Sequence, residues 1–195
     1  MNSNSPLNFK IADAPAEFEQ IHRLNYQTFA EEIPQHGPNP ECRLMDRFHH
    51  ENTYLICLDG DQLVGMMALR GKRPFSLDLK LENLDSYLPP GRRIVEVRLL
   101  SVARTHRNSQ VLPGLLKLLA GYGIPQGYNL AIISGTLRQR KLYRHLGFIP
   151  FGPLVGSPPA QFQPMYLTLE VFEEVVKKIV PNALVSTPTS TPGNG

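Results

Sequence analysis

The stretch Ile94–Val102, with the sequence IVEVRLLSV, decides the fold of this chain. β-Branched and aliphatic residues dominate it, so it strongly favours a β-strand. A basic turn, ARTHR at residues 103–107, follows at once. A helix is then expected from Ser109, which can cap it, through Gly121, because Pro113 in or near the first turn costs little there. The sequence thus predicts a central strand that runs through a basic turn into a helix.

Upstream of the central strand lies the clearest strand pair in the sequence. Residues 54–69 form two apolar runs, and Asp-Gly at 59–60 between them is a hairpin signal. A first strand is expected around residues 9–11. The helix after it can be capped by Asp13 and has Pro15 in its first turn.

Downstream of the central strand, strands and helices alternate. Strands are expected at 130–133 and 165–169, a basic helix at 137–146 and an amphipathic helix at 171–180. A polar excursion bounded by prolines occupies residues 71–92. The order of these elements predicts an α+β fold in which helices pack around one sheet.

The chain is expected to hold one domain. With 195 residues and 42% apolar composition, it can fill a single core over residues 1–181. Residues 182–195 carry no charge and are dominated by Ser, Thr, Pro and Gly, so they are interpreted as a flexible tail or linker.

Composition and charge exclude several classes of protein. Twenty Lys and Arg against 17 acidic residues give a formal charge of +3, which is too mild to indicate a nucleic-acid-binding protein. No apolar run is long enough to span a membrane, and the polar start lacks the apolar centre of a secretory signal. The expectation is a cytoplasmic protein. Cys42 and Cys57 make neither a disulfide scaffold nor a zinc site, and the histidines lack metal-ligand spacing with them, so no metal is expected.

Three stretches, in this order, resemble the GNAT superfamily of acyltransferases. They are the hairpin at 54–69 with Gly65 in its second strand, EVRLLSVARTHR at 96–107, and KLYRHLGF at 141–148. The resemblance implies a GNAT-like mixed, mostly antiparallel sheet that is splayed at its centre and has helices on both faces. It also implies an enzyme that moves an acyl group from a pantetheine thioester to an amine.

Two further stretches resemble one branch of that superfamily. TFAEEI at 28–33 and DRFH at 46–49 are similar to the N-acyl amino acid synthases and acyl-homoserine-lactone synthases. That similarity implies acyl-CoA or acyl-phosphopantetheine as co-substrate, with a long acyl chain and acyl-carrier protein among the donors, and a small-molecule amine as acceptor. Four cations at 138–144 could steer an acidic carrier protein, although a solvated helix face explains them as well.

The phosphate loop departs from the superfamily pattern. The corresponding positions are Arg107, Gln110 and Leu112, and the two small residues of the pattern are missing. Side chains there restrict the approach of backbone N–H groups to a pyrophosphate, which favours a donor with a single phosphate. Asn25 stands where the synthases usually carry an Arg, so the acceptor site is expected to differ from theirs.

The resemblance implies that donor-binding residues lie at the end of the central strand and in the turn after it. A bulge there would point backbone N–H groups at the pantetheine amides and the developing oxyanion. The cations and the helix N-terminus would attract a phosphate. An ordinary strand and a solvated turn are the alternatives. The residues concerned are Leu100, Ser101, Val102, Arg104, Arg107, Asn108, Ser109 and Gln110.

Two side chains are candidates for the proton transfers. The resemblance makes Tyr143 the acid that protonates the leaving thiolate; the alternative is a packed core aromatic. Glu96 is the first candidate for the base, acting directly or through water. On an extended strand Glu96, Arg98 and Leu100 would share one face, so Glu96 would face the cleft if Leu100 flanks it. A surface ion pair between Glu96 and Arg98 is the alternative.

Acceptor binding is assigned to Asn25, Phe29 and Asp46. Asn25 lies on the apolar stripe of the first helix, and a polar amide there needs a partner. It either binds a neighbouring loop or reads the acceptor. Asp46, Glu31 and Glu32 are reserves for the base.

The sequence therefore predicts an N-acyltransferase that acts by direct attack in a ternary complex. The acceptor is expected to be a primary amine of an amino acid or a similar small molecule; a protein amino terminus or a lysine remains open. The alternative from another class is a non-catalytic acyl-thioester-binding or regulatory module of a larger enzyme. The sequence does not indicate an oligomeric state.

Overall fold

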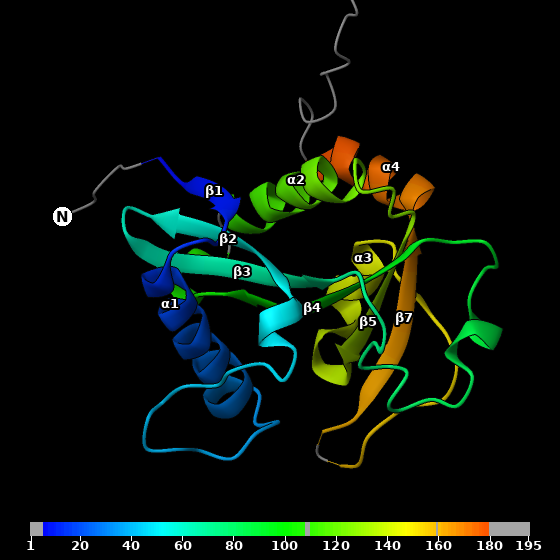
Figure 1. Cartoon of the computed structure of the whole chain (residues 1–195), viewed down its shortest axis with the longest axis horizontal. Coiled ribbons are helices and arrows are strands. Elements are labelled where there is room, and N and C mark those ends of the chain that lie inside the picture. The colour runs from blue at the N-terminus through cyan, green and yellow to red at the C-terminus, as the bar shows by residue number, and fades with distance from the viewer. Residues whose placement is uncertain (1–5, 108–109, 159, 180–195) are drawn as a thin grey trace, which may run out of the picture.

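A single seven-stranded sheet organises the molecule. The computed structural model describes residues 6–107, 110–158 and 160–179. The strands lie in the order β1-β2-β3-β4-β5-β7-β6 (Figure 1). Their bounds are Asn8–Ile11 for β1, Thr53–Asp59 for β2, Gln62–Arg70 for β3, Ile94–Val102 for β4, Leu130–Thr136 for β5, Ile149–Pro150 for β6 and Phe162–Thr168 for β7.

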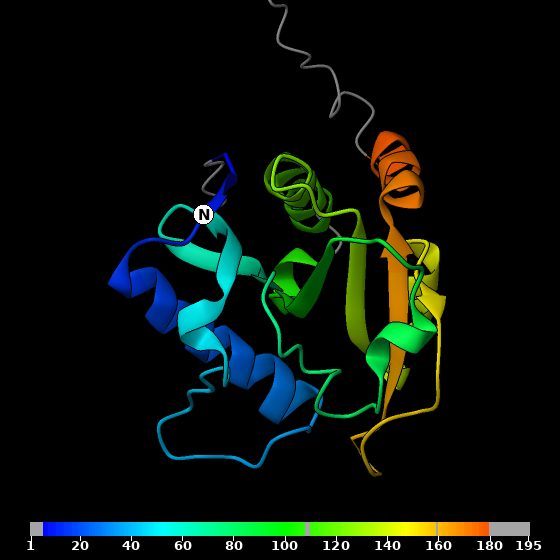
Figure 2. The same ribbon diagram turned by 45° about the vertical axis from the view of Figure 1, so that its right-hand side comes forward.

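Within the described residues, four α-helices flank this sheet. They are α1 at Pro15–Tyr26, α2 at Val111–Gly123, α3 at Arg140–His145 and α4 at Leu169–Ile179. A π-helical turn, Gln27–Glu32, continues α1. Figures 1 and 2 show α2 and α4 together on one face of the sheet and α1 on the other. The α+β fold with helices on both faces is confirmed.

Alternation along the strands explains the two faces. In β2, Leu55 and Cys57 pack with α2 and α4, whereas Tyr54, Ile56 and Leu58 pack with α1. Successive side chains of a strand point to opposite faces, so a strand that is apolar throughout can serve both layers.

The sheet is mixed and splayed at its centre, as expected. All neighbouring strands are antiparallel except β4 and β5, which are parallel. These two pair only where Ile94–Glu96 of β4 meets Leu130–Ile132 of β5. Beyond Glu96 the two strands separate, although β5 stays paired with β7 as far as Thr136.

Small residues let α2 approach the sheet closely. A Cβ at Gly65 of β3 would lie 2.3 Å from Cγ1 of Val111, and one at Gly114 of α2 would lie 2.1 Å from the ring of Phe9. No such contact is sterically possible, so glycine at both positions sets the distance between helix and sheet.

Several local predictions need correction. The first helix is capped at Ala14, not Asp13, because the Asp13 carboxylate binds Lys10 while Glu17 Oε2 accepts from the backbone N–H groups of Asp13 and Ala14. α2 continues two residues beyond Gly121, and β5 runs beyond residue 133. The short strand β6 was not expected. The predicted cap Ser109 and the predicted tail at 182–195 lie outside the described residues.

The excursion at 71–92, which was interpreted as polar, contributes apolar side chains to the core. Five of its side chains are buried against Leu130 and Ile132 of β5, and one short 3₁₀ turn lies within it. This packing holds the excursion against the part of β5 that pairs with β4. The buried residues are Phe75, Leu77, Leu81, Leu84 and Leu88.

No helix within the described part of the chain is both long enough and apolar enough to cross a lipid bilayer.

Candidate active site

A pocket of about 550 Å³ lies where β4 and β5 separate. That volume is within the range of small-molecule sites. Its walls come from both faces of the sheet, so the pocket runs through the gap between the two strands. One end is polar, and includes Asn25, Gln35, Asp46, Ser76 and Glu96; the other end is apolar, and includes Leu116, Leu119, Leu146, Phe148, Leu167, Phe172 and Val175.

A bulge in β4 forms one wall of the pocket. The pairing with β3 shifts by one residue between Met66 and Ala68, and Leu99 opposite them has a φ of 54°. The bulge therefore lies at Leu99–Leu100, at the start of the predicted segment. The extra residue reverses the alternation: Leu99 packs with the layer of α1, and Leu100 packs with the opposite layer.

This reversal corrects one sequence prediction. Glu96, Arg98 and Leu100 were expected on one face, but Leu100 lies on the other face from Glu96 and Arg98. The alternation rule holds only for an unbroken strand. Leu100 still lines the pocket, whereas the side chains of Ser101 and Val102 do not. Ser101 is buried, and its hydroxyl finds no partner among the described residues.

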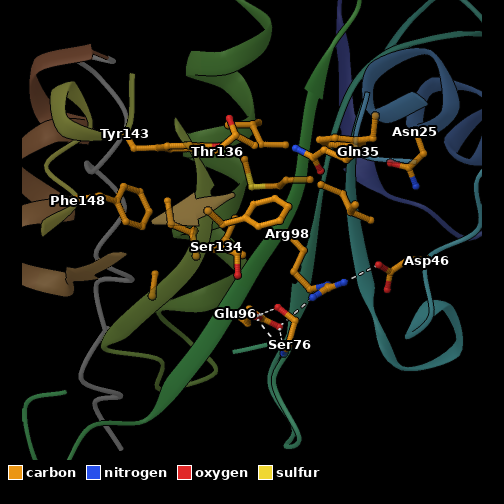
Figure 3. Close-up of a pocket in the computed structure, with 18 of the residues that line it drawn as sticks. Asn25, Gln35, Asp46, Ser76, Glu96, Arg98, Ser134, Thr136, Tyr143 and Phe148 are labelled. Atoms are coloured by element: carbon orange, nitrogen blue, oxygen red, sulfur yellow. Dashed lines mark hydrogen bonds and ion pairs between the residues drawn. The ribbon is translucent and has the colours of Figure 1, made fainter. Parts of the chain in front are cut away.

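Glu96 lies at the polar end of the pocket and is fully buried. Its Oε2 accepts from the Ser76 backbone N–H at 2.9 Å and from Arg98 Nη1 at 3.2 Å, and its Oε1 accepts from the Ser76 hydroxyl at 2.5 Å (Figure 3). The predicted ion pair with Arg98 is thus present, but it faces the pocket rather than a solvated surface. These contacts fix the position of the carboxylate.

Arg98 joins Glu96 to Asp46. Its Nη2 lies 2.6 Å from Asp46 Oδ2, and Asp46 Oδ1 accepts from the Phe48 backbone N–H at 2.8 Å. Burial by itself lowers the pKa of Arg98, but the carboxylates of Glu96 and Asp46 outweigh it and raise that pKa. Arg98 therefore links the two carboxylates and ties the loop before β2 to β4.

Tyr143 lies on the opposite side of the pocket from Asn25 and Asp46 (Figure 3). Its ring rests on Gly135 of β5, where an added Cβ would be only 3.0 Å from it. The hydroxyl donates to Gln139 Oε1 at 3.0 Å. Burial raises the pKa of Tyr143 to about 12, so the phenol is protonated at neutral pH. Tyr143 is thus both a packed aromatic and a pocket residue.

The predicted phosphate-binding cations are already paired. Arg104 Nε lies 2.9 Å from Glu32 Oε1, and Arg107 pairs with the other oxygen of the same carboxylate. Arg138 Nη1 donates to the backbone carbonyl of Glu32 at 2.8 Å. The carboxylate of Glu32, at the end of the π-helical turn, therefore binds the arginines that were predicted to bind a phosphate. The sequence could not indicate this contact, because Glu32 and Arg104 are 72 residues apart.

The other donor-side predictions have different outcomes. Gln110 is exposed at the N-cap of α2, and its side chain makes no capping hydrogen bond. Asn108 and Ser109 lie outside the described residues. The pocket-lining residues do not include Arg104, Arg107 or Gln110.

Asn25, Phe29 and Asp46 all line the pocket, so the structure brings the three predicted acceptor-side residues together. Asn25 is fully buried, and its Nδ2 donates to the Leu44 backbone carbonyl at 3.2 Å. Its Oδ1 has no partner within the described ranges. Both readings of Asn25 therefore have support: one end binds a loop and the other end is unsatisfied.

Sequence reasoning missed Ser76, Lys80, Arg47 and Gln139. Ser76 and Lys80 belong to the excursion, Arg47 follows Asp46, and Gln139 holds the Tyr143 hydroxyl. Only Arg47 had a signal, because it stands inside the DRFH stretch. The others reach the pocket by tertiary packing alone.

The described residues contain no group of three His, Cys, Asp or Glu side chains suited to a metal ion. Cys42 and Cys57 are free thiols. Cys57 is buried, and burial raises its pKa to about 11, so it is a poor nucleophile at neutral pH.

Comparisons with solved structures agree on the fold. FeeM, an N-acyl amino acid synthase from uncultured soil microbes, is 16% identical with a TM-score of 0.69 over 89% of this chain and 96% of FeeM. BjaI, a CoA-dependent acyl-homoserine lactone synthase solved with SAM and isopentyl-CoA, is 19% identical with a TM-score of 0.64 over 83% of this chain and 81% of BjaI. A protein from Desulfovibrio desulfuricans assigned to the GNAT family of acetyltransferases is 13% identical with a TM-score of 0.58, over 84% and 99% of the two chains.

The sequence comparisons give one match. No curated protein matches the chain. The model of the family described as "N-acyl amino acid synthase FeeM" matches residues 20–170, well over half of the 195 residues, including the strands that frame the pocket. The resemblance stated from the sequence is confirmed: the chain belongs to the N-acyl amino acid synthase FeeM family and is an acyltransferase with a GNAT-like fold.

Proposed function

We propose that this protein is an N-acyltransferase that moves an acyl group from a CoA or acyl-carrier-protein thioester to the primary amine of an amino acid or a similar small molecule. The observation that carries the proposal is the pocket through the splayed sheet. It has a polar end next to Glu96, a bulged strand in its wall, and an apolar end between α2 and α4. Membership of the synthase family supports the enzyme over a non-catalytic binding module.

The apolar end suits the acyl chain. Leu116 and Leu119 of α2, and Phe172 and Val175 of α4, offer hydrocarbon walls without charged groups. Burial of a methylene contributes roughly 0.8 kcal/mol, so such a wall favours chains longer than acetyl.

The wedge between the strands suits the thioester and its tether. From Val97 onward β4 has no pairing with β5. Backbone N–H groups on that side are available to bind pantetheine amides and to stabilise the oxyanion of the tetrahedral intermediate, whereas the Val102 carbonyl accepts from Arg107 Nε at 3.1 Å. Arg104 and Arg107 remain our proposal for the phosphate, provided that Glu32 releases them.

Glu96 is proposed to receive the proton of the attacking amine. Because the carboxylate has no exposed surface, a water molecule is the simplest link between it and an amine in the pocket. The carbon–nitrogen bond forms as the amine attacks the thioester carbonyl, and the carbon–sulfur bond then breaks. Asn25, Phe29 and Asp46 border the acceptor in this proposal.

Tyr143 is proposed to protonate the departing thiolate. Its hydroxyl hydrogen now points to Gln139 Oε1 and would swing to the sulfur. With a pKa of about 12 the phenol is protonated at neutral pH and so has a proton to donate. The transfer needs no acyl-enzyme, in line with the buried thiol of Cys57.

The test is a thiol-release assay. Acetyl and long-chain donors, on CoA and on acyl-carrier protein, are combined with a panel of amino acids and amines. We expect thiol release only when donor and amine are both present. Release that depends on neither amine nor chain, or binding of donor without release under every combination, would contradict the proposal.

A further inference from the structure

Two cations at the polar end of the pocket have no carboxylate partner. Arg47 and Lys80 both line the pocket, and neither pairs with an acidic side chain anywhere in residues 6–107, 110–158 or 160–179. The guanidinium carbon of Arg47 lies 5.4 Å from the ring centroid of Phe48. Lys80 Nζ donates to Ser134 Oγ at 3.3 Å and lies 4.6 Å from the ring centroid of Phe162.

The other three charged side chains of the pocket bind one another and together carry a charge of −1. Asp46 and Glu96 both bind Arg98. Arg98 is therefore shared between two carboxylates, and the pocket carries three cations against two anions, a net charge of +1. The surplus resides on Arg47 and Lys80.

The charge of Arg47 also acts on Lys80. Lys80 and Arg47 are exposed residues at the rim of the pocket, yet partial desolvation of the Lys80 ammonium lowers its pKa, and the positive charges of Arg98 and Arg47 lower it further, against the opposing effect of Glu96. An anion placed between Lys80 and Arg47 would relieve this repulsion. Ser134, whose hydroxyl is already within reach of Lys80, offers one more donor to such an anion.

We propose that Arg47 and Lys80, assisted by Ser134, form a carboxylate-binding site that orients the acceptor amine. This proposal rests on the proposed function, which it deepens. An α-amino acid matches the charge pattern: its carboxylate meets Arg47 and Lys80, and its amine faces the carboxylate cluster at Glu96. Once the amine has lost its proton, the acceptor carries −1 against the +1 of the pocket. An amine without a carboxylate leaves both cations unpaired.

The site predicts a selectivity that a simple amine pocket would lack. An amino acid and its carboxamide have the same amine and side chain, but the amide lacks the negative charge. Because a hydrogen bond to a charged group is worth about 1.5–3 kcal/mol, the loss of either cation should raise KM for the acid about tenfold or more. Neither cation acts on the reacting bonds, so kcat should change little.

The test compares the acid and amide forms of the best amino acid acceptor in the wild type and in Arg47→Gln, Lys80→Met and the double variant. Lys72→Met is the matched control, because Lys72 is an exposed lysine of the same excursion outside the pocket. We expect KM for the acid to rise about tenfold in each single variant, with kcat and KM for the amide unchanged. Equal KM values for acid and amide in the wild type, or parallel increases for both in the variants, would overturn the site.

A binding measurement separates this proposal from the proposed function. Titration calorimetry of the amino acid panel and the matching amides requires no turnover. Binding of acids but not of amides, lost in the double variant and kept in Lys72→Met, supports the carboxylate site even if no thiol is released, which would count against the proposed function alone. Equal binding of acids and amides, or binding of neither, overturns the site. Matching thermal unfolding curves for the variants show that they are folded.

Discussion

The two ends of β4 have opposite environments. Ile94–Glu96 pair with β5, and Glu96, which also pairs with Arg70 of β3, is fully buried. From Val97 to Val102 the strand is paired with β3 alone, and the bulge at Leu99 interrupts even that pairing. The pocket begins where the pairing between β4 and β5 ends.

This difference shows that the closed end holds the site in place and the open end supplies its space. A central strand normally satisfies its main-chain groups on both sides. Here β4 has no partner strand on its β5 side over six residues, Val97–Val102. The fold tolerates this loss, and the end that remains paired anchors the charge cluster around Glu96. Substitutions of side chains at each end test this division.

The largest effect is expected at the closed end, for Glu96→Gln. The amide cannot take a proton and cannot accept from both Ser76 and Arg98 in the same way, so kcat should fall by about 10²–10⁴. Steady-state thiol release measures it. Glu170→Gln is the control, because Glu170 is an exposed residue paired with Arg92. A loss below about threefold would remove Glu96 from the proposed chemistry.

At the open end, Tyr143→Phe should lower kcat by about 10² with little change in KM for either substrate. Tyr122→Phe is the matched control, since the Tyr122 hydroxyl bonds Thr53 outside the pocket. Because the pKa of Tyr143 is raised to about 12, the wild-type rate should not fall through ionisation of this phenol below that pH. An alkaline limb near pH 10 that disappears in Tyr143→Phe would contradict the raised pKa.

The apolar part of the open end should set the acyl-chain length. Leu119, Leu167 and Phe172 separate the pocket from a second cavity of about 40 Å³. Phe172→Ala should join the two spaces and raise kcat/KM for longer chains relative to the wild-type optimum by about tenfold, since a methylene in such a pocket is worth 1–3 kcal/mol. The removal of a buried ring should also cost about 3–5 kcal/mol of stability.

The chain-length prediction is measured as a donor series on CoA and on acyl-carrier protein. Val171→Ala is the control, because the neighbouring Val171 is exposed. A uniform loss across all chain lengths in Phe172→Ala would indicate damage to the fold instead of a longer pocket.

The smallest effect is expected beyond the open end, at Glu32. Glu32→Gln leaves Arg104 and Arg107 without their shared carboxylate, so KM for the donor should decrease about two- to fivefold at low salt. Kinetics at two ionic strengths measure it, because salt screens such exposed charges. Glu31→Gln is the comparison from the same turn. A donor KM that increases in Glu32→Gln would show that these cations do not bind the donor.

The prediction from sequence was accurate where the signal was local. Every strand in the described residues except β6 was expected, because apolar runs and the Asp-Gly turn act within a few residues. Helix ends were less accurate: Glu17, and not Asp13, makes the hydrogen bonds at the start of α1, by accepting from the backbone N–H groups of Asp13 and Ala14, while the Asp13 carboxylate binds Lys10. The sequence identified Glu96, Tyr143 and Asn25 as candidates, and all three line the pocket. It did not identify their hydrogen-bond partners Ser76, Gln139 and Leu44.

By itself the amino-acid sequence determined the strands, the order of the elements and the family, since hydrophobic periodicity and short motifs carry that information along the chain. The tertiary structure alone decided that Leu100 turns away from Glu96, that Glu32 occupies the basic turn, and that Arg47 and Lys80 meet at one pocket. Each of these depends on a single inserted residue or on contacts between segments tens of residues apart, and neither leaves a periodic mark in the sequence.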